Sequence, residues 1–283
     1  MTKPMSSVQA ALSEAIALLS PSTDSPQLEA ELLLAHSLAR PRSYLRAWPD
    51  ADISLAHLQA FTQLLQQRQQ GQPIAYILGK REFWSHEFMV TPDVLIPRSD
   101  TECLIEASLM RIANDLPISV LDLGTGSGII AITIAIERPL AQVYACDISP
   151  TALAVAKHNA ENHQQHIQFY QSDWYANIPK HTFDIIVSNP PYIAETDPHL
   201  RQGDLRFEPS NALASGIDGL TSLRTIIQDS GSYLSANGYL ILEHGYDQAP
   251  AVQTLLKSHS YQNIQTYTDL AGQPRVTLGQ KIV

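Results

Sequence analysis

Apolar residues recur at the spacing of helix faces through the first quarter of the chain. Three predicted helices place these residues inward: Val8, Leu12, Ala15, Ile16 and Leu19; Leu28, Leu32, Ala35 and Leu38; and Leu55, Leu58, Phe61 and Leu65. Ser25, Ser43 and Ser54 are the expected N-caps, and Pro26 suits the first turn of the second helix. The pattern predicts a helical bundle over residues 1–73 that carries no catalytic constellation and suits recognition better than chemistry.

The pattern changes after the bundle. Two short aromatic and β-branched runs, separated by polar residues, predict a β-hairpin linker over residues 74–92. From residue 93 to 283, strand-like apolar runs alternate with segments of helical character. This alternation predicts an α/β domain with a doubly wound, mainly parallel sheet.

Composition limits the class of protein. With 283 residues, 44% of them apolar, the chain is long enough for two packed modules. It opens on an amphipathic pattern, and its apolar stretches are too short to span a bilayer. Cys103 and Cys146 lack metal-ligand spacing, and the group His158, His163 and His166 is interpreted as a solvated helix end and loop. We therefore expect a cytoplasmic protein with reduced thiols, no metal and no membrane partner.

The charge is unevenly distributed along the chain. The formal net charge is −10, which argues against a protein that wraps a long nucleic acid. Residues 1–92 carry 7 Lys/Arg and 8 Asp/Glu, whereas residues 93–283 carry 11 and 20. The acidity therefore belongs to the predicted α/β domain, and the near-neutral first third offers no obvious basic surface for DNA.

A glycine-rich loop predicts a nucleotide-type site. The strand-like run that ends at Leu123 is followed by Gly124, Thr125, Gly126, Ser127 and Gly128, and then by a strongly apolar helical run. Glycines let the backbone approach a ligand, and the helix N-terminus offers free N–H donors. Asp147 ends the next predicted strand, about 20 residues on, where a ribose diol is bound in such folds.

The loop favours S-adenosylmethionine over a dinucleotide. Its glycines follow the spacing G-x-G-x-G, and Asp122, two residues ahead of the first glycine, suits an ammonium group better than a pyrophosphate. Asp173 could accept from an adenine amino group while Trp174 covers the adenine face. The alternative for Trp174 is a half-buried loop aromatic, and a dinucleotide site remains the alternative for the loop.

The sequence Asn189, Pro190, Pro191 and Tyr192 follows the apolar run 183–188. A planar nitrogen gives its lone pair to a neighbouring π system, so its methylation needs acceptors that hold the N–H groups. The Asn189 side-chain oxygen and the Pro190 carbonyl are such acceptors, and the prolines offer no N–H. Tyr192 would lie against a planar substrate. An ordinary strand-ending turn is the structural alternative.

One charged residue lies just ahead of the α/β domain's first predicted helix. Ser99 and Glu102 have the spacing of a capping box, which gives them a structural role. Arg98 is not explained in this way. It either holds an acidic group near the pocket mouth or makes a surface or domain-joining contact.

These motifs together resemble the protein-(glutamine-N5) methyltransferases of peptide chain release factors, the PrmC/HemK family. The resemblance covers nearly the whole chain, and its most specific segments are 71–79, 95–102, 122–128, Asp147, 189–192, Glu208 and Pro209 with Ala212 and Leu213, 242–245 and 275–279. The glycine loop is shared by class I methyltransferases in general. The Asn-Pro-Pro-Tyr sequence also occurs in adenine-N6 DNA methyltransferases.

The resemblance implies a site, an activity and a partner. Residues 124–128, Asp147, Trp174 and Asn189 would bind S-adenosylmethionine, with S-adenosylhomocysteine as product, and residues 189–192 would hold the substrate amide. The substrate implied is the glutamine of the Gly-Gly-Gln motif of bacterial release factors. A monomer without stable nucleic-acid binding is expected. Methylation of adenine in nucleic acid is the alternative activity, and a dehydrogenase or a non-catalytic adaptor is a more distant one.

The expected fold is a class I S-adenosylmethionine-dependent methyltransferase domain with a seven-stranded sheet. Strands are predicted near residues 118–123, 142–146, 166–170, 183–188, 238–243, 262–267 and 275–281. The ligand then belongs at the carboxyl ends of the first, second and fourth of these strands, where open sheets of this type leave a crevice.

Overall fold

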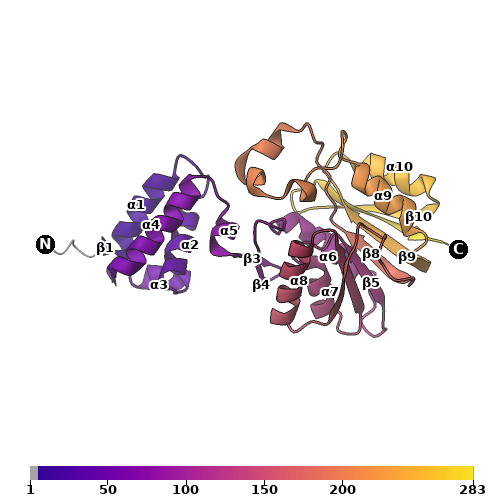
Figure 1. The fold of residues 1–283 in the computed structure, drawn as a ribbon, viewed down its shortest axis with the longest axis horizontal. Coiled ribbons are helices and arrows are strands. Elements are labelled where there is room, and N and C mark those ends of the chain that lie inside the picture. The colour runs from indigo at the N-terminus through magenta and orange to yellow at the C-terminus, as the bar shows by residue number, and fades with distance from the viewer. Residues whose placement is uncertain (1–5, 283) are drawn as a thin grey trace. The chain divides into compact units, whose positions relative to one another are not determined.

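The computed structural model describes residues 6–282. The chain divides into two compact units, with the boundary between Gly79 and Lys80 (Figure 1). Each unit has buried hydrophobic residues of its own, in one cluster in the first unit and in two clusters in the second. The boundary lies six residues beyond the expected end of the bundle at residue 73.

The N-terminal unit is a small helical bundle. Its elements are β1 (Ser6–Ser7), α1 (Val8–Leu19), α2 (Pro26–Ser37), α3 (Arg42–Ala47), β2 (Asp52–Ile53), α4 (Leu55–Gln69) and α5 (Ile74–Leu78). The two short strands pair antiparallel. Val8, Ala15 and Leu19 of α1 and Phe61 and Leu65 of α4 are buried in one core, as their spacing predicts.

The inward face of α2 differs from the predicted one. Leu28 is 42% exposed, and the buried residues are instead Ala30, Glu31, Leu33, Leu34 and Ala35. Glu31 can be buried because Arg42 approaches its carboxylate to 2.5 Å and Arg46 to 3.4 Å. The buried face of α2 therefore includes a carboxylate that is paired with two partly exposed arginines, and it differs from the face that the leucine spacing favours.

The N-caps follow the predictions only in part. Ser54 accepts from the backbone N–H of His57 at 3.3 Å, which confirms it as the cap of α4. Ser25 occupies the N-cap position of α2, but its side chain makes no cap hydrogen bond. The prediction for Ser43 is wrong, because α3 begins one residue earlier, at Arg42 after Pro41.

The predicted hairpin is present but shorter than expected. Strands β3 (Lys80–Phe83) and β4 (His86–Met89) pair antiparallel. Residues 74–78, expected at the start of the hairpin, form helix α5 instead. Pro73 at its N-cap and Gly79 in a left-handed conformation (φ 71°) bound this helix on either side.

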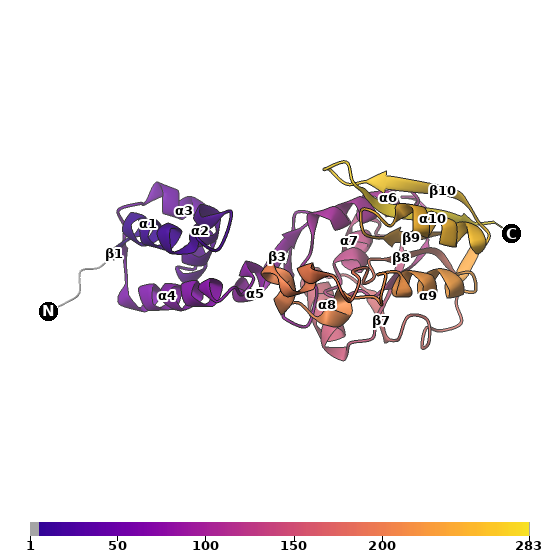
Figure 2. The ribbon, with the colours of Figure 1, turned by 90° about the horizontal axis from the view of Figure 1, so that it is seen from above.

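A seven-stranded sheet forms the centre of the second unit. Its strands are β5 (Ser119–Leu123), β6 (Gln142–Asp147), β7 (Ile167–Gln171), β8 (Phe183–Ser188), β9 (Leu234–Glu243), β10 (Tyr261–Thr268) and β11 (Pro274–Lys281). Their order is β10-β11-β9-β8-β5-β6-β7, and only β11 runs antiparallel to its neighbours. Figure 2 shows β10 at one edge. All seven predicted strands are confirmed.

Helices cover both faces of this sheet (Figure 1). One core contains buried residues of α6 (Glu102–Leu109), α7 (Ile129–Glu137) and α8 (Pro150–Asn162). The other contains residues of α9 (Thr221–Ser230) and α10 (Ala249–Ser258). Short 3-10 turns, η1 (Ser99–Thr101), η2 (Pro198–Arg201), η3 (Gly203–Phe207) and η4 (Ser210–Ala212), occupy the connections before α6 and α9. This is the doubly wound arrangement that the alternating pattern predicts.

The capping box predicted ahead of α6 does not form. Ser99 starts the turn η1, whose N-cap is Arg98, and no side chain caps either η1 or α6. The 3-10 turn leads directly into α6, so Glu102 is the first helical residue rather than the third.

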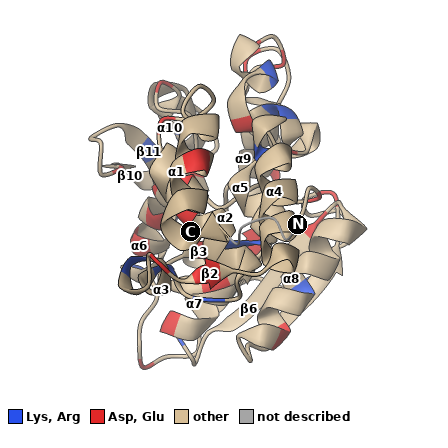
Figure 3. Cartoon of the chain, turned by 90° about the vertical axis from the view of Figure 1, so that its left-hand side faces the viewer, with Lys and Arg blue, Asp and Glu red and all other residues tan. Residues whose placement is uncertain are grey.

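Three further observations concern the described residues. Figure 3 shows Lys and Arg residues distributed over several elements, with Asp and Glu among them. Among the described residues, no helix is both long and apolar enough to cross a membrane. Both cysteines are free, with Cys146 buried and Cys103 partly exposed.

Candidate active site

A cavity of about 300 Å³ opens at the carboxyl ends of β5, β6 and β8. This is the predicted edge of the sheet, and the volume suits a nucleotide-sized ligand. The predicted site residues that line it are Gly124, Thr125, Gly126, Ser127, Asp147, Asp173, Trp174, Asn189 and Pro191. Asp122, Gly128, Pro190 and Tyr192 do not line it.

The glycine loop has the conformation that its sequence predicts. Gly124, Gly126 and Gly128 all have positive φ angles, of 71°, 56° and 86°. Gly128 is also the N-cap of α7, where a Cβ would lie 2.9 Å from Ile132 Cδ1 and 3.2 Å from Ala156 Cβ. The absence of a side chain therefore lets the loop and α7 pack closely against α8.

Asp147 is fixed by the main chain of the loops around it. Its Oδ2 accepts from the N–H of Gly126 and its Oδ1 from the N–H of Ser149, both at 2.9 Å. Burial raises the pKa of this carboxyl, and the backbone hydrogen bonds oppose that rise. Each oxygen keeps a second lone pair, so the carboxylate can still accept from a diol.

Trp174 lies against the glycine loop. A Cβ built on Gly124 would be 3.5 Å from Cζ3 of the Trp174 ring. The turn is held from behind, because Ser172 N–H donates to the Asp147 carbonyl and Ser172 Oγ to the Trp174 carbonyl. The ring is thus a half-buried loop aromatic that forms part of the cavity wall, and its contact with adenine stays a prediction.

Asp122 lies behind the loop instead of in the cavity. Its side chain is fully buried, and Thr125 Oγ1 donates to its Oδ2 at 2.6 Å. Its Oδ1 has no hydrogen-bond partner. Burial raises the pKa of Asp122 to about 7, with the Thr125 hydrogen bond opposing. Asp122 therefore supports the loop through Thr125, and its expected contact with an ammonium group stays a prediction.

Asn189 enters the cavity from the end of β8. Ser188, the last residue of that strand, donates from Oγ to the Leu123 carbonyl at 2.7 Å, so the ends of β8 and β5 are tied together. Nδ2 of Asn189 donates to Thr101 Oγ1 at 3.2 Å. The amide oxygen is therefore the Asn189 atom left to accept from a ligand, as its predicted role requires.

Tyr192 lies beside the cavity. Its hydroxyl donates to Oε1 of Glu243 at 3.3 Å, and its carbonyl accepts from Nε2 of Gln248 at 2.9 Å. Burial raises the pKa of the Tyr192 hydroxyl, so it remains a neutral donor. These two contacts hold the side-chain hydroxyl and the main chain of Tyr192.

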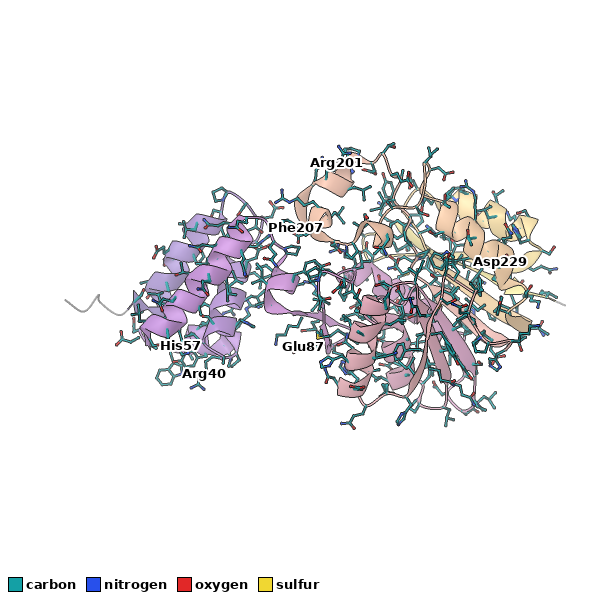
Figure 4. The ribbon with its side chains drawn as sticks, viewed as in Figure 1. Arg40, His57, Glu87, Arg201, Phe207 and Asp229 are labelled. Atoms are coloured by element: carbon teal, nitrogen blue, oxygen red, sulfur yellow. The ribbon has the colours of Figure 1, made fainter. Side chains whose placement is uncertain are left out.

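Arg98 holds an acidic group at the cavity, one of its two predicted roles. Its guanidinium pairs with Glu208 Oε1, and the Ile96 N–H donates to Glu208 Oε2 at 3.0 Å. The Glu208 side chain is fully buried. This pair fastens the segment between β8 and α9, which carries Arg201 and Phe207 (Figure 4), to the cavity wall.

Part of the lining carries no motif that chemistry alone would single out. These residues are Asp93, Val94, Leu95, Pro97, Thr101, Ile148, Asn211, Ala212, Ala214 and Ser222. They come from η1 and the segment before it, from the turn after β6, and from the start of α9 and the connection before it. Only the family resemblance of residues 95–102 and of Ala212 drew attention to some of them.

Comparison with known proteins places this geometry in a family. The PrmC N-terminal domain model matches residues 10–79, and the methyltransferase small domain model matches residues 101–205. A release factor glutamine methyltransferase of Vibrio cholerae is 48% identical over 276 residues, which cover 96% of each chain. The chain belongs to the release factor glutamine methyltransferase family.

Further comparisons agree with this family assignment. The release factor glutamine methyltransferase of Aliivibrio fischeri is 45% identical over 280 residues, or 98% of each chain. Among solved structures, a 16S rRNA N2 G1207 methyltransferase of T. thermophilus in complex with AdoMet and guanosine aligns with a TM-score of 0.53. It is 19% identical and covers 71% of this chain and 49% of its own, so it shows the fold that this member of the family shares with other methyltransferases.

Proposed function

We propose that this chain transfers the methyl group of S-adenosylmethionine to the side-chain amide nitrogen of the glutamine in the Gly-Gly-Gln motif of peptide chain release factors. One observation carries the proposal. The acceptor oxygen of Asn189 and the glycine loop with Asp147 line the same cavity. Family membership with release factor glutamine methyltransferases supports this substrate.

The residues present fit S-adenosylmethionine. Asp147 offers free lone pairs to the ribose hydroxyls, and Trp174 offers a ring face to the adenine. Asp173 is the proposed acceptor for the adenine amino group, and the amides of residues 124–128 face the methionine end with the N-terminus of α7. Asp122 acts on this set through Thr125.

S-adenosylmethionine supplies an electrophilic sulfonium methyl group when bound. The contribution of this chain is positioning: Asn189 Oδ1 accepts one N–H of the substrate amide, and the Pro190 carbonyl is the proposed second acceptor. Pro191 and Tyr192 then confine the amide plane. No general base is assigned, because the N-methylated, protonated amide is acidic enough to lose its proton to water.

The function is tested by supplying labelled S-adenosylmethionine with either release factor or DNA. Label is expected on the glutamine of release factor and absent from DNA. The control is a release factor with Gly-Gly-Gln changed to Gly-Gly-Ala, which should accept no label. Label on adenine in DNA would favour the alternative activity, and label on the control would move the acceptor to another residue.

We further propose a division of labour along the chain. Residues 1–73 recognise the protein substrate, residues 74–92 connect the two domains, and residues 93–283 bind the cofactor and catalyse methyl transfer. The support is that all cavity-lining residues lie at or after Asp93, and that the first unit has its own core. One planar amide cannot distinguish one glutamine from many others, so selectivity needs additional contacts.

A truncated chain that begins after Gly79 tests this division. We expect it to bind S-adenosylmethionine and to methylate a short Gly-Gly-Gln peptide at nearly the full-length rate. Its kcat/KM for whole release factor should fall towards the peptide value. Equal whole-protein activity from a folded truncated enzyme would place recognition in the second unit.

A further inference from the structure

A hydroxyl group behind the cavity connects two residues of the proposed acceptor site. Thr101 ends the turn η1 and is 1% exposed. Its Oγ1 accepts from Asn189 Nδ2 at 3.2 Å, across 88 positions of sequence. A threonine hydroxyl has only one hydrogen, and the Asn189 contact leaves it free to be donated elsewhere.

Glu243 is the acceptor beside that hydroxyl. It ends β9, whose residue Leu242 pairs with Ser188 of β8, immediately before Asn189. Hydrogen bonding with the Thr101 side chain is the largest influence that lowers the pKa of Glu243. Oε1 of Glu243 also accepts from Tyr192, whereas its buried Oε2 has no hydrogen-bond partner. One carboxyl group thus accepts from Tyr192 and lies beside Thr101, the partner of Asn189.

The direction of these hydrogen bonds decides which atom Asn189 presents to the cavity. Thr101 Oγ1 presents a lone pair to Asn189 Nδ2, and an ionised carboxylate can only accept, so a Thr101 hydrogen directed at Glu243 keeps that lone pair in place. The amide oxygen then faces the ligand. If the Thr101 hydrogen pointed at Asn189 instead, the amide would turn over and present its NH₂ group, which cannot accept from a substrate amide.

We propose that Thr101 and Glu243 are positioning residues that fix the orientation of the Asn189 amide, so that its oxygen accepts from the substrate nitrogen. This inference rests on the proposed function and deepens it by assigning residues that set the acceptor polarity. Glu243 also fixes Tyr192 through its hydroxyl, so one carboxyl orients two members of the Asn-Pro-Pro-Tyr sequence.

The charges around Glu243 fit this role. Burial raises its pKa to about 7, opposed by Thr101, by Arg275 and by Tyr192, while Asp100 raises it further. Arg275 is itself held by Asp100 and Asp269, each at 3.1 Å. Cys103, from α6, lies close enough for Glu243 to raise its pKa. The carboxylate therefore forms within the physiological range, and the polarity it imposes should strengthen as pH rises through about 7.

Thr101→Val is the main test because it keeps the side-chain shape and removes the hydroxyl that accepts from Asn189 and lies beside Glu243. Thr101 makes no side-chain cap to α6, so no helix cap is lost. We expect kcat for a Gly-Gly-Gln substrate to fall about 10- to 100-fold, below the full effect of losing Asn189, with KM for that substrate changed less. Thr101→Ser should restore kcat to within about threefold of wild type, since it keeps the hydroxyl.

The matched control is Thr254→Val on α10, where the hydroxyl donates only to the Pro250 carbonyl at 2.8 Å and is exposed. Its kcat should equal that of wild type. Wild-type kcat in folded Thr101→Val, or a failure of Thr101→Ser to recover, would overturn the inference. If Thr101→Val does not fold, the activities of Thr101→Ser and Glu243→Gln still test whether Thr101 and Glu243 orient Asn189.

Glu243→Gln tests the pH dependence. Wild-type kcat should rise as pH passes about 7, because the carboxylate form imposes the productive polarity, and the rise should vanish in the glutamine variant. A retained pH dependence would remove Glu243 from the role.

A readout without turnover separates this inference from the proposed function. In ¹⁵N-labelled full-length protein, the Asn189 side-chain NH₂ signals, assigned by their loss in Asn189→Ala, should shift with pH in wild type and not in Glu243→Gln. That result would stand even if release factor proved not to be the substrate. Signals that do not respond to pH in wild type would overturn the inference whatever the substrate is.

Discussion

The two walls of the cavity are built in different ways. The wall proposed for the cofactor is made of loop backbone directly after β5 and β6, and Asp147 is held by main-chain N–H groups 2 and 21 residues away. The wall proposed for the acceptor depends on distant side chains. Thr101 lies 88 residues from Asn189, and Glu243 and Gln248 lie 51 and 56 residues from Tyr192. Local backbone thus builds one wall, and tertiary contacts between side chains build the other.

The largest expected effect comes from the acceptor wall. Asn189→Ala removes the proposed acceptor oxygen, and loss of such a positioning group costs on the order of 100- to 1,000-fold in rate. Single-turnover methyl transfer to a Gly-Gly-Gln peptide measures it, with a thermal melt as control for folding. Near-normal turnover in the folded variant would remove Asn189 from the acceptor wall.

The cofactor wall should respond in affinity instead. Asp147→Ala removes the carboxylate proposed to accept from both ribose hydroxyls, and charge-assisted hydrogen bonds of this kind contribute roughly 1.5–3 kcal/mol, or about 10- to 150-fold. Calorimetric titration with S-adenosylmethionine measures the change, and titration with NAD should show no binding. An unchanged Kd would separate Asp147 from the cofactor, and tight NAD binding would revive the dehydrogenase alternative.

A pair of glycine substitutions sharpens the contrast. Gly128→Ala places a methyl group 2.9 Å from Ile132 Cδ1 behind the cofactor loop, whereas Gly219→Ala places one 2.3 Å from the Tyr192 carbonyl. Both positions have positive φ, which costs a side chain roughly 1–2 kcal/mol before any clash. We expect Gly128→Ala to weaken cofactor affinity more than turnover, and Gly219→Ala to do the opposite.

Measuring Kd for S-adenosylmethionine and kcat in both glycine variants decides the matter. Gly272→Ala is the matched control, since it also has positive φ but meets nothing within 4 Å. If Kd and kcat change equally in both variants, the two walls do not respond independently to substitution.

The smallest effect on the site is expected from Asp122→Asn, which keeps an oxygen for Thr125 and cannot ionise. The pKa of Asp122 is raised from 3.8 to about 7 in the fold, so the folded protein binds this proton more tightly than the unfolded chain. Stability from this group is therefore lost as pH rises from about 4 to about 7. The free energy of unfolding of the variant minus that of wild type should therefore increase between about pH 4 and pH 7 and remain constant above pH 7.

Urea unfolding at several pH values, without ligand, measures this difference. A constant difference between the two proteins would show that Asp122 titrates alike in both states. A large loss of S-adenosylmethionine affinity in the variant would restore the direct ammonium contact that the sequence suggested.

Errors in the sequence predictions have two sources, partners that are remote in sequence and the exact residue at which a helix begins. The seven strands were predictable because each is a short apolar run with turn residues beside it, and runs of this kind are the strongest local signal. The inward face of α2 was not, because burial of Glu31 depends on Arg42 and Arg46 in another helix. Ser43 and Ser99 had suitable identities for caps, but the helix starts were set by the turns around them.

The sequence by itself determined the two modules, the sheet, the glycine loop and the identity of the acceptor motif, since each is encoded by neighbouring residues and their backbone preferences. Tertiary structure alone decided that Asp122 lies behind the loop, that Arg98 pairs with Glu208, and that Thr101 and Glu243 flank Asn189 and Tyr192. The physical reason is the range of the interactions. Backbone conformation depends on adjacent residues, whereas the polarity of a buried hydrogen-bond chain depends on groups that only the folded sheet brings together.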